Sequence, residues 1–466
     1  MEKKDIPFLS VAELSELIGQ KEVSPIEVVE SYLERIDSLN FKFNSYLTVC
    51  REEALQSARE AEQAIAQENY IGAMHGIPVA VKYQLWTKGI RTTIGSRIMA
   101  DFFPQEDATA VANLKKAGAI ILGKTNLTEF AIGGSQRYGP NRNPWDLDMF
   151  TGGSSGGSGS ATAAFLCATS LGEDTGGSVR RPAAWCGLAG LRPSWGRVSR
   201  YGVMPGSWSM DQVGPISRMV EDAAITLTAI AGYDPKDPYS RDVPVPNYRA
   251  ALDGDIRGIR VGAITDLIHS EIVDPEVRDA VVKAGSVLGE LGATVEEVSL
   301  PLMVHCGTIT GTLINVESAM TYRDWIRERL HEFGHSNQIG LLTGALMPAQ
   351  TYYKVQKLRE LVRRQLFEAL ESYDVLILPT SKSCAPRLED YQVVTSKETA
   401  AVPPVMTRPF NLANAPALSV NCGFNSQGLP IGLQIGGRPF AEEMVLKVGH
   451  AYEQNTPWHT MRPPNA

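Results

Sequence analysis

Short apolar runs alternate with longer amphipathic segments along the whole chain, and this alternation constrains the fold more than any other feature. The run Ile77–Lys82 has the length and composition of a strand buried on both faces. The segment Pro275–Leu291 instead repeats its apolar residues at helical spacing. Both patterns recur as far as Ile431–Gln434. The alternation predicts an α/β protein with a mixed, mostly parallel sheet covered by helices on both faces.

The domain organisation follows from what the sequence lacks. No internal repeat and no low-complexity linker divides the 466 residues, of which 43% are hydrophobic. We therefore expect a single large domain over residues 1–466. Within it we expect a mainly helical region over residues 1–70, a catalytic core over 71–220, and the rest of the sheet with substrate-side helices over 221–466.

Composition argues against several classes of protein. The chain has 44 basic and 52 acidic residues, a net charge of −8, without a polybasic run, so we expect no nucleic-acid partner. A polar start and the lack of a long apolar stretch argue against a secretory signal and membrane insertion. The six cysteines are widely spaced, as in reduced cytoplasmic proteins. The seven histidines show no ligand spacing, so we expect no metal and no cofactor.

Two segments rich in glycine and serine, Gly152–Ser160 and Gly172–Ala184, stand out from the rest of the chain. A stretch of this composition is often a flexible linker. Each segment here is flanked by apolar, structured sequence, however. Glycine in such a setting allows close approach of the backbone or a positive φ, so both segments are candidates for a functional site.

The second segment has a definite chemical logic. A helix is expected to begin just after Ser178, with Pro182 in its first turn. Unpaired N–H groups at a helix start bind anions, so the Ser178 hydroxyl would lie beside an oxyanion hole. A serine nucleophile also needs a base. Lys82, at the end of a buried strand, either extends to the surface or is a desolvated amine able to accept a proton. From this segment alone, a simple glycine turn with a capping serine is the better interpretation.

Taken together, the two segments resemble the signature of the amidase signature family. The separation of 24 residues between Ser154 and Ser178 equals that between the family's bridging serine and its nucleophile. The resemblance extends over most of the chain, through the segments His75–Lys82, Gly118–Asn126, Asn143–Asp146, Asp211–Pro215, Pro409–Asn411 and Gly428–Phe440.

The resemblance implies a role for each matching residue. Ser178 would be the nucleophile, Ser154 the bridging serine after a cis peptide bond from Gly153, and Lys82 the base. Backbone N–H groups of the oxyanion hole would come from Thr175, Gly176 and Gly177, and supporting contacts from Ser155, Asp174 and Arg180. The chain departs from the family at Tyr83, where an aspartate is usual. We therefore expect the Lys82 amine to be held by the hydroxyls of Ser154 and Ser155, and not by a carboxylate.

These roles predict a serine amidase that cleaves linear amides through an acyl-enzyme, with ester or carbamate hydrolysis as a side activity. Its partner would be a small-molecule amide, and a homodimer would suit the family. The candidate substrate-binding residues are Gly134, Ser135, Gln136 and Trp208.

Two alternatives stay open. The glutaminase subunit of a tRNA-dependent amidotransferase belongs to the same family and, by resemblance, grips the carboxylate of glutamine with an arginine near Tyr352. No arginine occurs from Gly334 to Tyr353, so a stand-alone amidase is favoured. A non-catalytic or nucleotide-binding protein is the other alternative, because Gly118–Thr125 fits G-x-x-x-x-G-K-[ST]. That motif needs a loop, whereas these residues look like a strand.

Overall fold

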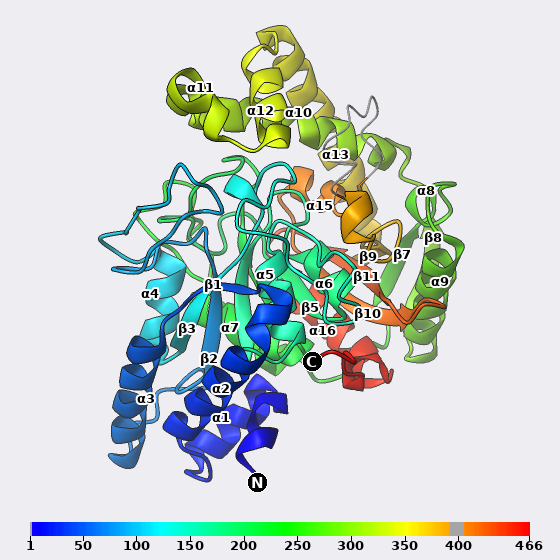
Figure 1. Ribbon diagram of the computed structural model, residues 1–466. Helices are drawn as coiled ribbons and strands as arrows, with labels where there is room; N and C mark the ends of the chain where they lie inside the picture. The colour runs from blue at the N-terminus through cyan, green and yellow to red at the C-terminus, as the bar shows by residue number, and fades with distance from the viewer. Residues whose placement is uncertain (1, 392–404) are drawn as a thin grey trace.

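The computed structural model describes residues 2–391 and 405–466. Its centre is a sheet whose described strands number eleven, in the order β1-β3-β2-β4-β6-β5-β10-β11-β9-β7-β8 (Figure 1). The strands are β1 Tyr46–Val49, β2 Pro78–Lys82, β3 Ile120–Thr125, β4 Thr169–Glu173, β5 Ala189–Arg192, β6 Val213–Ser217, β7 Arg260–Ile264, β8 Thr294–Val298, β9 Val375–Pro379, β10 Ala417–Phe424 and β11 Pro430–Gly437.

The sheet is mixed, as predicted, but parallel pairing does not predominate. Four of the ten neighbouring pairs are parallel and six are antiparallel, counted over the described strands. The expectation of a mostly parallel sheet is therefore wrong. An apolar run indicates that a strand is buried, but it does not indicate the direction in which the strand pairs. The strands β10 and β11, for example, pair antiparallel because a tight turn after Asn425 joins them as a hairpin.

Helices cover both faces of the sheet. Alternate residues of a strand point to opposite faces. On β11, a Cβ at Gly432 would contact Ala184 of α6, whereas one at Gly437 would contact Val445 of α16. The helices α6 and α16 therefore lie on opposite faces, which confirms the predicted α/β layering.

The α-helices run from one end of the chain to the other. They are α1 Val11–Gly19, α2 Pro25–Phe43, α3 Arg51–Ala66, α4 Thr109–Lys116, α5 Gly156–Ala163, α6 Arg180–Cys186, α7 Val220–Ile230, α8 Thr265–Ile268, α9 Pro275–Glu290, α10 Cys306–Thr321, α11 Arg323–Arg329, α12 His335–Ala345, α13 Ala349–Ser372, α15 Arg408–Ala413 and α16 Glu442–Gln454. Short 3-10 helices are η1 Lys3–Phe8, η2 Glu129–Ala131, η3 Tyr248–Ala251, η4 Pro301–His305, η5 Leu330–Glu332 and η6 Trp458–Thr460.

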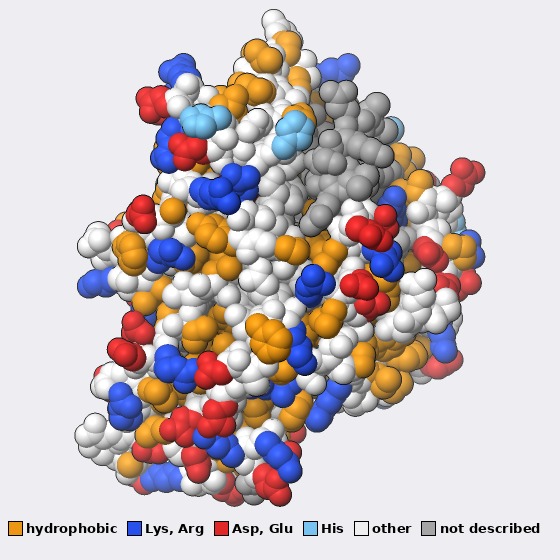
Figure 2. All heavy atoms as spheres, viewed as in Figure 1, with side chains coloured by type: hydrophobic (Ala, Val, Ile, Leu, Met, Phe, Trp, Pro, Cys, Tyr) orange, Lys and Arg blue, Asp and Glu red, His pale blue; other side chains and the backbone are white. Residues whose placement is uncertain are grey.

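One group of helices stands apart from the layers on the sheet. In Figure 1, α10, α11 and α12 form a cap above one end of the sheet, and α13 leads back from the cap to the sheet. None of the described helices is long and apolar enough to cross a membrane. On the face shown in Figure 2, acidic and basic side chains are interspersed.

Candidate active site

The predicted base, Lys82, is the last residue of β2. This strand pairs in parallel with β3 on one side and β4 on the other. The Lys82 side chain is fully buried, and its Nζ donates to Ser154 Oγ at 2.8 Å and to the Glu173 carbonyl at 3.2 Å. Burial lowers the pKa of Lys82, which favours the neutral amine that a proton acceptor requires.

A carboxylate also reaches this amine. Glu173 Oε2 lies 3.3 Å from Lys82 Nζ, and neither side chain is exposed. The expectation that hydroxyls alone hold the amine is therefore wrong. Parallel pairing aligns Val81 of β2 with Leu171 of β4, so the carboxyl ends of the two strands meet. Ser155 contacts the Glu173 backbone instead, donating to its carbonyl at 3.2 Å and accepting from its N–H at 3.3 Å.

A second carboxyl group is linked to Glu173 through a threonine. Thr175 Oγ1 lies 2.7 Å from Glu173 Oε1 and 2.7 Å from Asp211 Oδ1. A hydroxyl has one hydrogen to donate, so both contacts are hydrogen bonds only if one carboxyl group carries a proton. Burial, and then the charge of Glu173, raise the pKa of Asp211 to about 8. The raised pKa of Asp211 favours Asp211 as the carboxyl group that carries this proton.

The first glycine–serine segment is tightly packed. The peptide bond between Gly153 and Ser154 is cis, as the resemblance implied. A Cβ at Gly157 of α5 would lie only 2.5 Å from the backbone N of Asn126. The glycines thus allow the backbone to approach its neighbours closely, and the segment is not a linker.

The predicted nucleophile, Ser178, lies just before α6. The loop before the helix is tied to Asp174, which accepts hydrogen bonds from the N–H groups of Gly177 at 2.8 Å and Val179 at 3.2 Å. The fully buried Arg180 guanidinium donates to the same carboxylate at 2.9 and 3.1 Å. Burial would raise the pKa of Asp174, but the adjacent Arg180 holds it well below its ordinary value. This ion pair fixes the loop beneath Ser178.

The predicted oxyanion donors differ in availability. The N–H of Gly177 is already donated to Asp174. Thr175 and Gly176, in contrast, have backbone N–H groups without a partner in the described part of the chain. These two N–H groups, near the amino end of α6, are the donors that could face an oxyanion.

Ser178 and Ser154 open onto one cavity of about 640 Å³. Over residues 2–391 and 405–466, no hydrogen bond joins their two hydroxyls, so only the link from Lys82 to Ser154 is formed. Hydrogen bonds of this kind often tighten only when substrate is bound. The cavity walls come from the segment around η2, the signature loops, the cap helices α10 and α12, Tyr391 and the start of α15.

Only part of the predicted substrate site lines this cavity. Gly134 does, whereas Ser135 and Gln136 are not lining residues; Ser135 Oγ is 3.0 Å from Ser336 Oγ, and Ser336 does line the cavity. Trp208 lies elsewhere and is 41% exposed, with its ring tilted by 36° against that of Tyr239 at a centroid distance of 5.4 Å. Several lining residues were not predicted from the sequence: Arg181, Asn315, Ile339, Tyr391 and Arg408. Only Arg181, three residues after Ser178, could have been found from the signature itself.

Two other sequence features have structural explanations. Residues 120–125 of the nucleotide-binding pattern form β3, and the buried Lys124 donates to Thr87 Oγ1 at 2.7 Å. The nucleotide-binding alternative is therefore wrong, because no phosphate loop exists there. Tyr83 turns away from the predicted base, with its hydroxyl 2.8 Å from Thr48 Oγ1. Within the described residues, no group of three or more His, Cys, Asp or Glu side chains could hold a metal ion.

Comparison with known proteins agrees with this geometry. The sequence model of the Amidase family matches residues 27–446. The chain belongs to the amidase signature family. A glutamyl-tRNA(Gln) amidotransferase subunit from Moorella thermoacetica is 41% identical, covering 98% of this chain and 99% of the relative.

Solved structures of other amidase signature proteins superpose closely on this one. The amidotransferase subunit of the same name from Thermotoga maritima has a TM-score of 0.84 at 32% identity, covering 98% of both chains. A bacterial aryl acylamidase of the same family has a TM-score of 0.87 at 27% identity, covering 97% of both chains.

These relatives correct one prediction. We expected no nucleic-acid partner from the net charge and the lack of a polybasic run. The relative at 41% identity is a subunit of an enzyme named for glutamyl-tRNA(Gln), so this expectation is wrong. Charge composition describes only the chain itself, whereas a subunit can serve a tRNA-dependent reaction through the assembly to which it belongs.

Proposed function

We propose that this amidase signature protein hydrolyses the C–N bond of an amide through an acyl-enzyme on Ser178. The observation that carries the proposal is the 2.8 Å hydrogen bond between the buried Lys82 amine and Ser154, at a cavity onto which Ser178 also opens. A desolvated amine can be neutral, and a neutral amine can accept a proton.

The reaction follows from the positions of these groups. Lys82 takes a proton from Ser154, which takes one from Ser178, and Ser178 Oγ attacks the amide carbonyl carbon. The N–H groups of Thr175 and Gly176 stabilise the oxyanion. The proton then returns through Ser154 to the leaving nitrogen, the C–N bond breaks, and water hydrolyses the acyl-enzyme.

The names of the relatives support glutamine as the amide and a partner acting on glutamyl-tRNA(Gln) as the acceptor of its ammonia. The relative of this name is 41% identical and covers 98% of this chain. This setting is therefore preferred over the stand-alone amidase. The lack of an arginine from Gly334 to Tyr353 does not exclude it, because Arg181 and Arg408 bring guanidinium groups to the cavity from other elements.

A second candidate function is stand-alone amide hydrolysis with ester or carbamate side activity. It is favoured by Ile339 of α12, which gives the cap side of the cavity an apolar wall, and by the likeness to the aryl acylamidase. The two functions are distinguished by comparing ammonia release from glutamine with cleavage of aryl anilides. A preference for anilides of at least roughly tenfold in kcat/KM, a difference of about 1.4 kcal/mol, would favour the second function.

The nucleophile is tested by covalent labelling. A fluorophosphonate probe should modify Ser178, and Ser178→Ala should lose the label and several orders of magnitude of turnover while remaining folded by circular dichroism. Ser299→Ala, at an exposed position, is the matched control and should keep both. A label that persists in Ser178→Ala on another side chain would show that the nucleophile was misassigned.

A further inference from the structure

Two arginines that line the catalytic cavity have N–H donors without a hydrogen-bond partner among the described residues. Arg181 lies in the first turn of α6, and Arg408 begins α15. Each has a buried Nε without a hydrogen-bond partner among the described residues. Within the described part of the chain, their side-chain hydrogen bonds go to backbone carbonyls, from Arg181 Nη2 to Gly153 at 2.9 Å and from Arg408 Nη1 to Gly307 at 2.8 Å.

The neighbouring Arg180 shows what a structural arginine looks like in this fold. Its guanidinium binds the Asp174 carboxylate and also donates to Gln434 Oε1 and Asn411 Oδ1, both at 2.6 Å. In the described part of the chain, Arg181 and Arg408 have no such ion pair, so structural roles do not use up their donors.

The described walls of the cavity carry positive charge from Arg181 and Arg408. None of its described lining residues is an aspartate or a glutamate. Burial, and next the charge of Arg181, lower the pKa of Arg408 to about 10, so Arg408 remains cationic at neutral pH. Both side chains are partly buried and have no charged partner among the described residues, an unfavourable setting for a cation that an anion bound between them would relieve.

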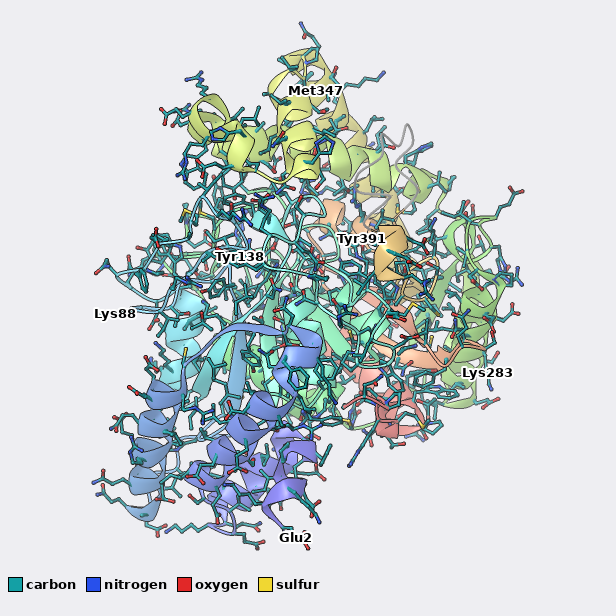
Figure 3. The ribbon with its side chains drawn as sticks, viewed as in Figure 1. Glu2, Lys88, Tyr138, Lys283, Met347 and Tyr391 are labelled. Carbon is teal, nitrogen blue, oxygen red and sulfur yellow. The ribbon has the colours of Figure 1, made fainter. Side chains whose placement is uncertain are left out.

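The two guanidinium groups lie close to the reacting atoms. Arg408 Nε is 3.6 Å from the position that a Cβ on Gly176 would occupy, and Gly176 is two residues before Ser178. Arg181 is held at Gly153, next to Ser154. Tyr391, labelled in Figure 3, also lines the cavity, beneath the cap helices. An anion here would be only a few bonds from the scissile carbonyl.

We propose that Arg181 and Arg408 form an anion subsite that binds a carboxylate on the acyl part of the substrate. The substrates are then short amides with a carboxylate a few bonds from the scissile carbonyl, with glutamine in this class. Arginine suits the role because its planar N–H donors match the geometry of a carboxylate. This inference rests on the proposed amide hydrolysis at Ser178, and it supplies the carboxylate recognition that the stretch from Gly334 to Tyr353 lacks.

The experiment compares amides of matched size. Succinamate and butyramide differ in the acyl-side carboxylate, and N-butyrylglycine carries its carboxylate on the leaving group. Wild-type kcat/KM should favour succinamate over butyramide by about a hundredfold, as expected for hydrogen bonds to a charged group. In Arg408→Met and Arg181→Gln this ratio should fall at least roughly tenfold, mainly through KM. Arg278→Met, on α9 away from the cavity, should preserve it.

A binding measurement on the wild-type protein covers the case in which the variants do not fold. Succinate should slow probe labelling of Ser178, and the neutral succinamide should not. Labelling of Ser178 with hydrolysis of all amides but no succinamate preference would overturn the subsite and leave the proposed function standing. A preference for N-butyrylglycine instead would also overturn it. If Ser178 is not labelled and no amide is cleaved, the proposed function itself fails.

Discussion

At the scale of single residues, two opposing electrostatic effects act on Lys82. Burial lowers the pKa of its amine, whereas the Glu173 carboxylate at 3.3 Å raises it, as does the charge of Asp174. The residue can act as a base only while desolvation prevails. The carboxylate beside the amine comes from β4, whereas Tyr83, which follows Lys82 in the sequence, has its hydroxyl at Thr48.

Replacing Glu173 with glutamine tests this balance. The Glu173→Gln variant keeps the shape of the side chain but removes the charge that raises the pKa of Lys82. The amine should then deprotonate at lower pH, so the rising limb of the kcat/KM profile should move to lower pH. Lys82→Arg is the control and should stay inactive throughout, because a guanidinium does not deprotonate. A limb displaced to higher pH would contradict this account.

The sequence predicted some site residues and missed others for identifiable reasons. Ser154, Ser178 and Lys82 lie in local motifs with a fixed spacing, so the resemblance could assign them. Glu173 was missed as a partner of Lys82 although it belongs to the signature segment. Its position beside the amine depends on the register between β2 and β4, which no local pattern encodes.

At the scale of secondary-structure elements, the backbones of the cap helices α10 and α12 approach each other closely. A Cβ at Gly344 of α12 would lie 1.9 Å from the Asn315 carbonyl oxygen of α10. Both helices line the catalytic cavity, α10 through Ile314 and Asn315 and α12 through Ile339. Their separation therefore sets the width of the cavity on that side.

A pair of glycine substitutions tests this role. Gly344→Ala should push α12 away from α10, lower the melting temperature and raise KM, because backbone cannot yield cheaply to the new methyl group. Gly340→Ala on the same helix meets only the Asn315 side chain, at 3.2 Å. It should be neutral or stabilising, since alanine favours a helix by about 1 kcal/mol over glycine. Equal effects from the two variants, in melting curves and kinetics, would rule out the close contact.

Element predictions succeeded where the apolar pattern was strong. The strand expected over Ile77–Lys82 is β2, and the helix expected over Pro275–Leu291 is α9. The cap helix α10 was not predicted. Its sequence is rich in threonine and glycine, which are poor helix formers, so it is a helix mainly because of its packing against α12 and α13.

At the scale of the whole molecule, three helices from distant parts of the sequence meet: α1, α7 and α16. Two buried carboxyl groups connect them. Asp222 of α7 accepts from the N–H of Ala12 in α1 at 3.2 Å. Glu453 of α16 accepts from the N–H of Val220 at the start of α7 at 3.0 and 3.1 Å. Burial raises the pKa of Asp222 to about 7 and that of Glu453 to about 8.

These carboxyl groups should make the stability of the fold depend on pH. At neutral pH Glu453 is protonated in the folded protein, whereas in the unfolded chain it is ionised, with its ordinary pKa of 4.5. The folded state therefore binds the extra proton, so the free energy of unfolding should fall as pH rises from about 5 to about 8. The charges of Asp222 and Glu221 also raise the pKa of Glu453.

The variant Glu453→Gln isolates this contribution, because glutamine resembles the protonated acid and can still accept the N–H of Val220. Urea unfolding at several pH values should show the wild-type protein losing stability relative to Glu453→Gln between pH 5 and 8. The relative loss should be on the order of a few kcal/mol, at about 1.4 kcal/mol for each pKa unit. Glu443→Gln, at an exposed position on α16, should run parallel to the wild type. If the unfolding free energy of Glu453→Gln had the same pH dependence as that of the wild type, Glu453 would be ionised in the folded protein. The link between α7 and α16 would then be an ordinary helix cap.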